Sequence, residues 1–319
     1  MEPNRRAVVD VGTNSIKLLV AEVCGNEVRP LWEESRQTRL GQGFYETHRL
    51  QPGPITNTAQ AVAAFAAQAR ELQARTVRVI ATSAARDARN AEELTAAIEQ
   101  ASGLKVEIIS GEQEAHYAFL GVTTDPALAR EPLLLLDVGG GSTEFILGQG
   151  QHQHFRHSFP LGTVRLMEKI PHSDPPRAEQ LAGCRQWLKE FFDQHVQPRL
   201  RPAMDLEVSR AQAHAPLQLV GTGGTATILG CMEAQLSAFD RQRVEATRLS
   251  LPQIQAHAER LWQLPLEERK KTVGLPANRA DVILTGVAIY EAVLQCLSLP
   301  ELRLSTRGVR FAAVLDQPE

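Results

Sequence analysis

Apolar runs of strand length alternate with helix-like stretches along this chain, a pattern that predicts an α/β protein. The first half reads as three β-like segments followed by alternating helices and strands, in the order β-β-β-α-β-α-β. These elements are expected at residues 5–11, 16–23, 27–39, 55–73, 77–81, 91–101 and 105–109. A further helix should begin near Ser110, because Ser110 and Gln113 have the S-x-x-Q spacing of a capping box.

The second half follows a proline-containing linker at 123–132 and opens with another run of three β-like segments. The expected strands lie at 133–138, 143–148, 152–159, 217–220 and 301–305, and the expected helices at 178–197, 252–264 and 279–297. Residues 171–177 are rich in proline and charge and read as a loop. A terminal helix should follow the last strand.

One strand–turn–strand motif occurs twice. Residues 10–15 (DVGTNS) and 137–142 (DVGGGS) each follow one apolar run and precede another, at a constant offset of 127 residues. Such a repeat implies two related domains. We expect the first at 1–124, joined by a terminal helix at 307–319, and the second at 125–306.

The composition of both turns suits phosphate binding. Glycines expose backbone N–H groups without a Cβ, and consecutive N–H groups form an anion-binding concavity. Serine and threonine hydroxyls add further donors. The candidates from these turns are Gly12, Thr13, Asn14, Ser15, Gly139, Gly140, Gly141, Ser142 and Thr143. A pair of tight hairpin turns, where Asp and Gly are also favoured, is the alternative explanation.

Four carboxylates are candidates for chemistry at these turns. Asp10 and Asp137 end their strands and would repel phosphate, so each makes sense as a ligand of a bridging divalent cation. Glu144 shares a strand face with Ser142, because side chains two residues apart point the same way, and therefore looks towards the bound phosphate. Glu114 lies in the first turn of its predicted helix, where it can alternatively complement the helix dipole.

Ser83 and Arg86 follow a predicted buried strand, at a sheet edge where ligands gather. Arg86 can fork onto phosphate oxygens, or be an ordinary surface side chain. His152, His154 and His157 resemble a metal cluster, but we interpret them as facing solvent, since His157 is out of phase with the other two on a strand.

Residues 221–226 fit the G-x-G-x-x-A dinucleotide fingerprint, with Asp240 about twenty residues further on. Their position late in the chain weakens that interpretation. A glycine-rich turn whose following helix N-terminus faces an anion explains the same residues, and makes Gly223 a phosphate-binding candidate.

Composition places the chain among ordinary globular proteins, with 319 residues, 43% apolar and 22% charged. No apolar run approaches the roughly 18 residues of a membrane span and no signal-peptide core is present, so we expect a cytoplasmic protein without a membrane partner. The net charge of −3 gives no general attraction to nucleic acid. The four cysteines are scattered, which favours free thiols over a disulfide frame or zinc site.

Several stretches occur in one order across essentially the whole chain. They are AVVDVGTNSIKLLV (7–20), ATSAARDARN (81–90), ISGEQEA (109–115), LLLLDVGGGSTEFIL (133–147), PLGTVR (160–165), VGTGGTAT (220–227) and GLPANRADVILTG (274–286). Together they resemble the exopolyphosphatase/guanosine pentaphosphate phosphohydrolase (Ppx/GppA) family. The resemblance implies two ribonuclease-H-like domains of the actin/hexokinase/Hsp70-like fold, with the active site in the cleft between them.

The resemblance also implies hydrolysis of terminal phosphoanhydride bonds with Mg²⁺ (or Mn²⁺), K⁺ being a further candidate ion. Glu114 matches the family's catalytic glutamate in S-G-x-x-E-A, and Glu144 matches the acid of D-x-G-G-G-S-x-E. Gln113 departs from the many relatives that have a second glutamate there. The chain ends too soon for the HD-type helical region of longer relatives. A homodimer is common in the family.

We therefore expect an exopolyphosphatase, in which Asp10, Asp137 and Glu144 hold the cation and Glu114 activates water. Hydrolysis of pppGpp is the first alternative. A kinase of the same fold and a non-catalytic nucleotide-binding protein are the others, and the kinase would need an acceptor site. The sequence does not decide between polyphosphate and pppGpp.

Overall fold

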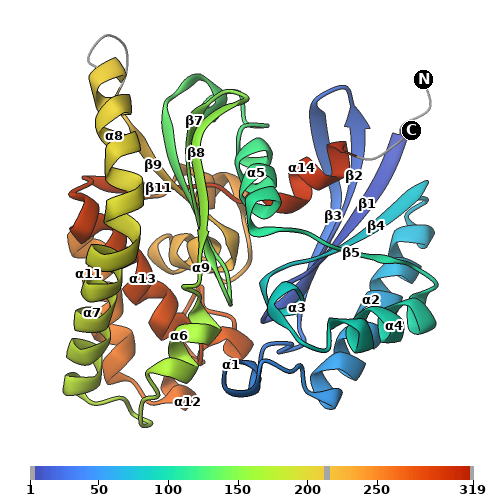
Figure 1. The fold of residues 1–319 in the computed structure, drawn as a ribbon, viewed down its shortest axis with the longest axis horizontal. Coiled ribbons are helices and arrows are strands. Elements are labelled where there is room, and N and C mark those ends of the chain that lie inside the picture. The colour runs from blue at the N-terminus through green and yellow to red at the C-terminus, as the bar shows by residue number, and fades with distance from the viewer. Residues whose placement is uncertain (1–3, 212–215, 317–319) are drawn as a thin grey trace. The chain divides into compact units, whose positions relative to one another are not determined.

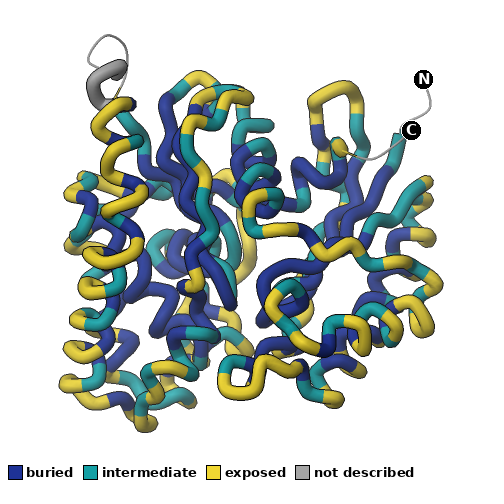
Figure 2. Tube along the Cα trace, in the orientation of Figure 1, coloured by how far each residue is buried: buried dark blue, intermediate teal, exposed yellow. Residues whose placement is uncertain are grey.

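The computed structural model describes residues 4–211 and 216–316, and the chain divides into two compact units (Figure 1). Unit 1 comprises Met1–Pro126 and Arg307–Glu319, and unit 2 comprises Ala127–Thr306. Each unit contains one mixed β-sheet with helices packed against it, which makes the protein α/β. The central strands of both sheets are mostly buried (Figure 2), as their long apolar runs require, whereas β3, β5 and β8 are largely half-buried or exposed.

Unit 1 has a five-stranded sheet in the order β3-β2-β1-β4-β5, in which β1, β4 and β5 are parallel and β2 and β3 antiparallel. The strands are β1 (Asn4–Val11), β2 (Ser15–Cys24), β3 (Glu27–Gln37), β4 (Thr76–Ala81) and β5 (Val106–Ile108). The helices are α1 (Phe44–Thr47), α2 (Pro52–Glu71), α3 (Ser83–Asp87), α4 (Ala91–Ser102), α5 (Gly111–Val122) and α14 (Val309–Leu315). Ala7, Val9 and Val11 join a core with α2 and α4, while α14 packs against β1, β2 and α5.

Unit 2 repeats this topology and adds an edge strand, in the order β10-β11-β9-β6-β7-β8. The strands are β6 (Leu133–Val138), β7 (Thr143–Gln149), β8 (His152–Phe159), β9 (Gln218–Thr222), β10 (Arg248–Ser250) and β11 (Glu301–Leu304). The helices are α6 (Thr163–Lys169), α7 (Ala178–Phe191), α8 (Gln197–Ala211), α9 (Gly223–Glu233), α10 (Arg241–Ala246), α11 (Leu251–Gln263), α12 (Leu266–Arg269) and α13 (Ile283–Leu297). Three short helical turns, Leu128–Arg130, Phe192–Val196 and Ala277–Arg279, complete the unit.

The duplicated motif forms the same hairpin in both units. Asp10 lies opposite Lys17 in β1 and β2, and Asp137 lies opposite Glu144 in β6 and β7. The N–H of Gly12 donates to the carbonyl of Ser15 (3.1 Å), as the N–H of Gly139 does to the carbonyl of Ser142 (2.9 Å). The structure thus confirms the predicted duplication down to strand register.

The predicted elements differ from the structure mainly in the second half. The helix expected at 178–197 is interrupted by a π-helical turn and continues as α8, which carries Pro202 in its interior. The helix expected at 279–297 begins only at Ile283, because a 3₁₀ turn precedes it. The sequence pattern did not predict strand β10 or the short helices α1, α3, α6, α10 and α12. The predicted terminal helix extends over Val309–Leu315, and residues 317–319 lie outside the described part.

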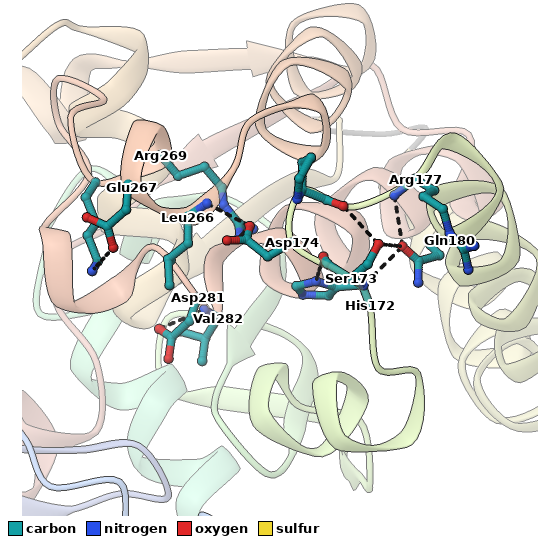
Figure 3. A network of polar contacts seen from close by, with 12 residues as sticks. His172, Ser173, Asp174, Arg177, Gln180, Leu266, Glu267, Arg269, Asp281 and Val282 are labelled. Carbon is teal, nitrogen blue, oxygen red and sulfur yellow. Dashed lines mark hydrogen bonds and ion pairs between the residues drawn. The ribbon is translucent and has the colours of Figure 1, made fainter.

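The segment after α6 is fixed by polar contacts rather than by regular structure (Figure 3). The side chain of Gln180 accepts from the N–H groups of Ser173 and Arg177, which anchors the expected 171–177 loop at the start of α7. Asp174 accepts from the N–H of Leu266 (2.8 Å) and from the buried guanidinium of Arg269 (3.4 Å). The loop is therefore tied to α12.

Within the described ranges, no helix is both long and apolar enough to cross a membrane. All four cysteines are free thiols, as expected.

Candidate active site

In unit 1, the turn after β1 is held from one side by the backbone of residues 38–41. The carbonyl of Thr13 accepts from the N–H of Gly41 (2.7 Å), and the carbonyl of Asn14 accepts from Thr38 and Arg39 (3.2 and 3.0 Å). In a planar trans peptide the N–H points opposite to the C=O. The N–H groups of Asn14 and Ser15 are consequently directed away from these contacts, as a phosphate-holding turn requires.

Several buried polar atoms near this turn have no hydrogen-bond partner among the described residues. They are Asp10 Oδ1, Thr13 Oγ1, Asn14 Nδ2, Ser15 Oγ and Ser83 Oγ. They lie at the carboxyl ends of β1 and β4 or in the turn that leads into β2. The two strands pair in parallel, and the N–H of Thr82 donates to the carbonyl of Val11 (3.2 Å). Buried polar atoms are nearly always paired in native proteins, so this concentration indicates a place for a polar ligand.

Asp10 is the one acidic residue in that group of described residues. Burial raises the pKa of its carboxyl above the ordinary value, and the nearby charges of Lys17 and Arg310 only partly oppose this. An ionised Asp10 with an unpaired buried oxygen is costly by itself. A bound cation or its hydration water would satisfy that oxygen, so the residue fits the predicted metal role.

Glu114 and Arg86 form an ion pair in unit 1. Ser110 caps α5 by accepting from the N–H of Gln113 (3.1 Å), which places Glu114 in the first turn of the helix. Arg86 Nη1 donates to Glu114 Oε2 (2.9 Å) and to the carbonyl of Ile109 (3.2 Å). Arg86 therefore orients the carboxylate of Glu114, which is 8% exposed, and its contact with phosphate stays a prediction.

In unit 2, helix α6 holds the glycine turn from behind. The carbonyls of Gly139 and Gly140 accept from Thr163 and Val164 (3.0 and 2.8 Å), and the carbonyl of Gly141 accepts from Arg165 Nε (2.7 Å). By the same peptide geometry, the N–H groups of Gly140, Gly141 and Ser142 point away from α6. Three successive N–H groups then form one donor surface.

A second repeat, which the sequence analysis missed, supports both turns. The dipeptides Leu40–Gly41 and Leu161–Gly162 follow the third strand of their units, and both leucines are fully buried. A Cβ on Gly41 would lie 2.3 Å from Thr13 Cγ2, and one on Gly162 would lie 2.5 Å from the carbonyl of Gly140. The recurrence of Leu-Gly after the third strand was the available signal.

Asp137 and Glu144 lie opposite each other at the carboxyl end of β6. Glu144 is 1% exposed, and its Oε1 accepts from Ser158 Oγ (2.7 Å). Like charges directly opposite in a sheet destabilise it unless something compensates. Among the described residues no group of three or more His, Cys, Asp or Glu could hold a metal ion. Two carboxylates suit Mg²⁺, which usually completes its shell with water and substrate phosphate oxygens.

The turn from β9 into α9 lies next to Asp137. Gly223 has φ +88°, and a Cβ there would lie 2.5 Å from Asp137 Oδ1. Tyr290 Oη donates to the carbonyl of Thr222 (3.2 Å). Burial, with a smaller effect of the Asp137 charge, raises the pKa of Tyr290 well above its ordinary value, so the hydroxyl keeps its proton.

The other candidate residues make structural contacts or face solvent. Thr143 Oγ1 donates to the carbonyl of Leu161, so this hydroxyl supports the turn. Asp240 caps α10 by accepting from the N–H of Arg243 (3.1 Å) and does not end a second strand, as a dinucleotide site would need. His152 and His154 are exposed as expected, but His157 is half-buried and packs edge-on against Phe159.

These features define a class of protein: two α/β units of the actin-like ATPase fold, each with an Asp–Gly turn between its first two strands. The Ppx/GppA phosphatase family model matches residues 19–317, and the chain belongs to this family.

Curated relatives and solved structures agree with that assignment. The chain is 33% identical to exopolyphosphatase 2 of Mycobacterium tuberculosis over 301 residues, which cover 91% of this chain and 90% of the relative. It is 26% identical to exopolyphosphatase 1 of Mycobacterium bovis, over 98% and 87% of the two chains. The crystal structure of the Aquifex aeolicus Ppx/GppA family member superposes with TM-score 0.76 at 30% identity, covering 98% and 96%. An exopolyphosphatase from Cytophaga hutchinsonii gives 0.84 at 26%, covering 98% of each chain.

Proposed function

We propose that this protein is an exopolyphosphatase, which removes the terminal phosphate of inorganic polyphosphate by attack of water. Family membership and the names of the two mycobacterial relatives support the proposal. The observation that carries it is the set of buried polar atoms without partners around the unit 1 turn. A phosphate chain supplies many acceptor oxygens, which the hydroxyl and amide groups of this set need, whereas Asp10 Oδ1 needs a cation or a water molecule.

The two turns offer different kinds of donor. The turn of unit 1 presents the side chains of Thr13, Asn14 and Ser15, whereas that of unit 2 presents the N–H groups of Gly140 and Gly141. Ser83 adds a hydroxyl in unit 1 and Gly223 an N–H at the start of α9 in unit 2. Both sets bind phosphoryl oxygens in this proposal.

Asp137 and Glu144 are the residues of unit 2 that would hold Mg²⁺, and Asp10 is the candidate cation ligand of unit 1. When bound, the cation offsets negative charge on the phosphoryl oxygens. Glu114, held by Arg86, accepts a proton from the attacking water. The water oxygen forms a bond to the terminal phosphorus as the bridging P–O bond breaks, and the shortened chain leaves with the bond's electron pair.

The test compares phosphate release from long polyphosphate, short polyphosphate and pppGpp with Mg²⁺ and without any acceptor. Release from polyphosphate at the highest kcat/KM supports the proposal, whereas preference for pppGpp assigns the alternative activity. Turnover that requires an acceptor alcohol or carboxylate would indicate a kinase. Repeating the assay with Mn²⁺ shows whether that ion can replace Mg²⁺.

Glu114→Gln removes the proton acceptor but keeps the size of the side chain. It should lower kcat by about 10²–10⁴-fold with little change in polyphosphate binding. Glu112→Gln, an exposed position two residues earlier on α5, is the matched control and should retain wild-type kcat. Equal kcat for both variants would remove Glu114 from the mechanism.

A further inference from the structure

Tyr290 lies beneath the β9–α9 turn of unit 2. It is fully buried on α13, and its hydroxyl donates to the carbonyl of Thr222 (3.2 Å). Gly221 leaves the space for its ring, because a Cβ there would lie 2.9 Å from both Cε1 and Oη of Tyr290. The hydroxyl thus reaches this turn only because β9 has a glycine at that point.

The turn that Tyr290 contacts is the one beside Asp137. Thr222 lies opposite Asp137 in the β6–β9 ladder, and Gly223 approaches the Asp137 carboxylate closely enough to exclude any Cβ. Since the carbonyl of Thr222 points at Tyr290, the N–H of the same peptide, that of Gly223, points the opposite way. One hydrogen bond therefore fixes the direction of the Gly223 donor.

We propose that Tyr290 is a positioning residue for the reaction, which holds the Thr222–Gly223 peptide against Asp137. This inference rests on the proposed phosphohydrolase activity. Catalytic groups need to be held within about 0.5 Å of productive geometry, and a peptide that can rotate would not meet that need. Tyr290 itself does not touch the reacting atoms.

A purely structural role for Tyr290 makes a different prediction, and Trp262 supplies the control. Trp262 is also a buried aromatic residue of unit 2, and its Nε1 donates to a backbone carbonyl, that of Leu284 (3.3 Å). Tyr290→Phe and Trp262→Phe each remove one such hydrogen bond. If only core stability matters, both should affect activity equally.

The experiment measures polyphosphate hydrolysis and backbone hydrogen exchange in both variants. For Tyr290→Phe we expect kcat to fall by about 5–30-fold with KM within about twofold, and exchange across residues 218–226 to accelerate. Trp262→Phe should keep kcat within about twofold and leave exchange in that segment unchanged. Gly221→Ala, which displaces the hydroxyl without deleting it, should reproduce the loss in kcat.

Two results would overturn the inference: equal kcat in Tyr290→Phe and Trp262→Phe, or unchanged exchange at 218–226 in Tyr290→Phe. If the wild-type protein releases no phosphate from any substrate, the proposed function fails instead. In that case the exchange measurement still decides whether Tyr290 fixes the turn.

Discussion

Replacing Gly162 by alanine tests whether the glycine turn of unit 2 needs its support. Gly162 has φ −150° and ψ 164°, an extended conformation that alanine adopts without strain. Any effect of the substitution must therefore come from the added methyl group. That group would lie 2.5 Å from the carbonyl carbon and oxygen of Gly140 and from the carbonyl carbon of Gly141.

The size of the effect follows from these distances. Ordinary contacts of a Cβ begin at 3.4 Å, so the turn or α6 must move by about 0.9 Å, the difference from 2.5 Å. The atoms met are backbone and cannot rotate aside. Overpacking of this kind costs roughly 1–3 kcal/mol, and a displacement near 1 Å at a reacting group can lower turnover by about 10²-fold.

The assay measures kcat and Tm for three alanine variants. Gly183→Ala lies within α7 with nothing near the new methyl, so it should raise stability by about 0.5–1 kcal/mol and leave kcat unchanged. In Gly41→Ala the new methyl group meets mainly a side-chain methyl, that of Thr13. This variant should therefore lower kcat and Tm less than Gly162→Ala does. A Gly162→Ala protein with the kcat and Tm of the wild type would show that the turn tolerates displacement, and would refute the reasoning.

Two further predictions follow from the pKa shifts. Burial raises the pKa of Asp10 above 3.8, so ionising this carboxyl is unfavourable in the folded state. The free energy of unfolding therefore falls as the pH rises above 3.8, and the loss is complete above the raised pKa. In metal-free protein near pH 8, Asp10→Asn should raise Tm while lowering activity, and a lower Tm would contradict this. Burial, and secondarily Glu291, raises the pKa of Cys184 to about 12, so on the order of 10⁻⁴ of it is thiolate at pH 8. A thiol reagent should modify exposed Cys24 rapidly and Cys184 only after denaturation, and fast labelling of Cys184 would exclude its burial.

The hairpins were predictable because their determinants are local. Alternating or continuous apolar runs bounded by Asp, Gly and Asn located β1, β2, β6 and β7 within a residue or two. Helix α8 was not predictable, because a proline in a helix interior disfavours a helix and α8 contains Pro202. Tertiary contacts maintain the helix nevertheless. Helix α6 has only seven residues, too few to show a periodic pattern.

The sequence names the candidate residues of the site but not the contacts among them. Arg86 and Glu114 both follow parallel strands of unit 1, yet their ion pair depends on side-chain geometry that no spacing encodes. The Thr143 hydroxyl was expected to face phosphate but donates to Leu161, a residue that only the returning chain brings near. Gly41 and Gly162 were missed because their role is the absence of a side chain against a distant turn.

A difference in charge beside the two strand-end aspartates distinguishes the hairpins. Lys17 and Glu144 occupy equivalent positions, each opposite the strand-end aspartate. In unit 1 the lysine partly neutralises Asp10 and so reduces its demand for a metal ion. In unit 2 two carboxylates face each other, which creates that demand. In the proposed function, the exchange of lysine for glutamate at this position therefore gives the unit 2 turn the greater demand for a cation.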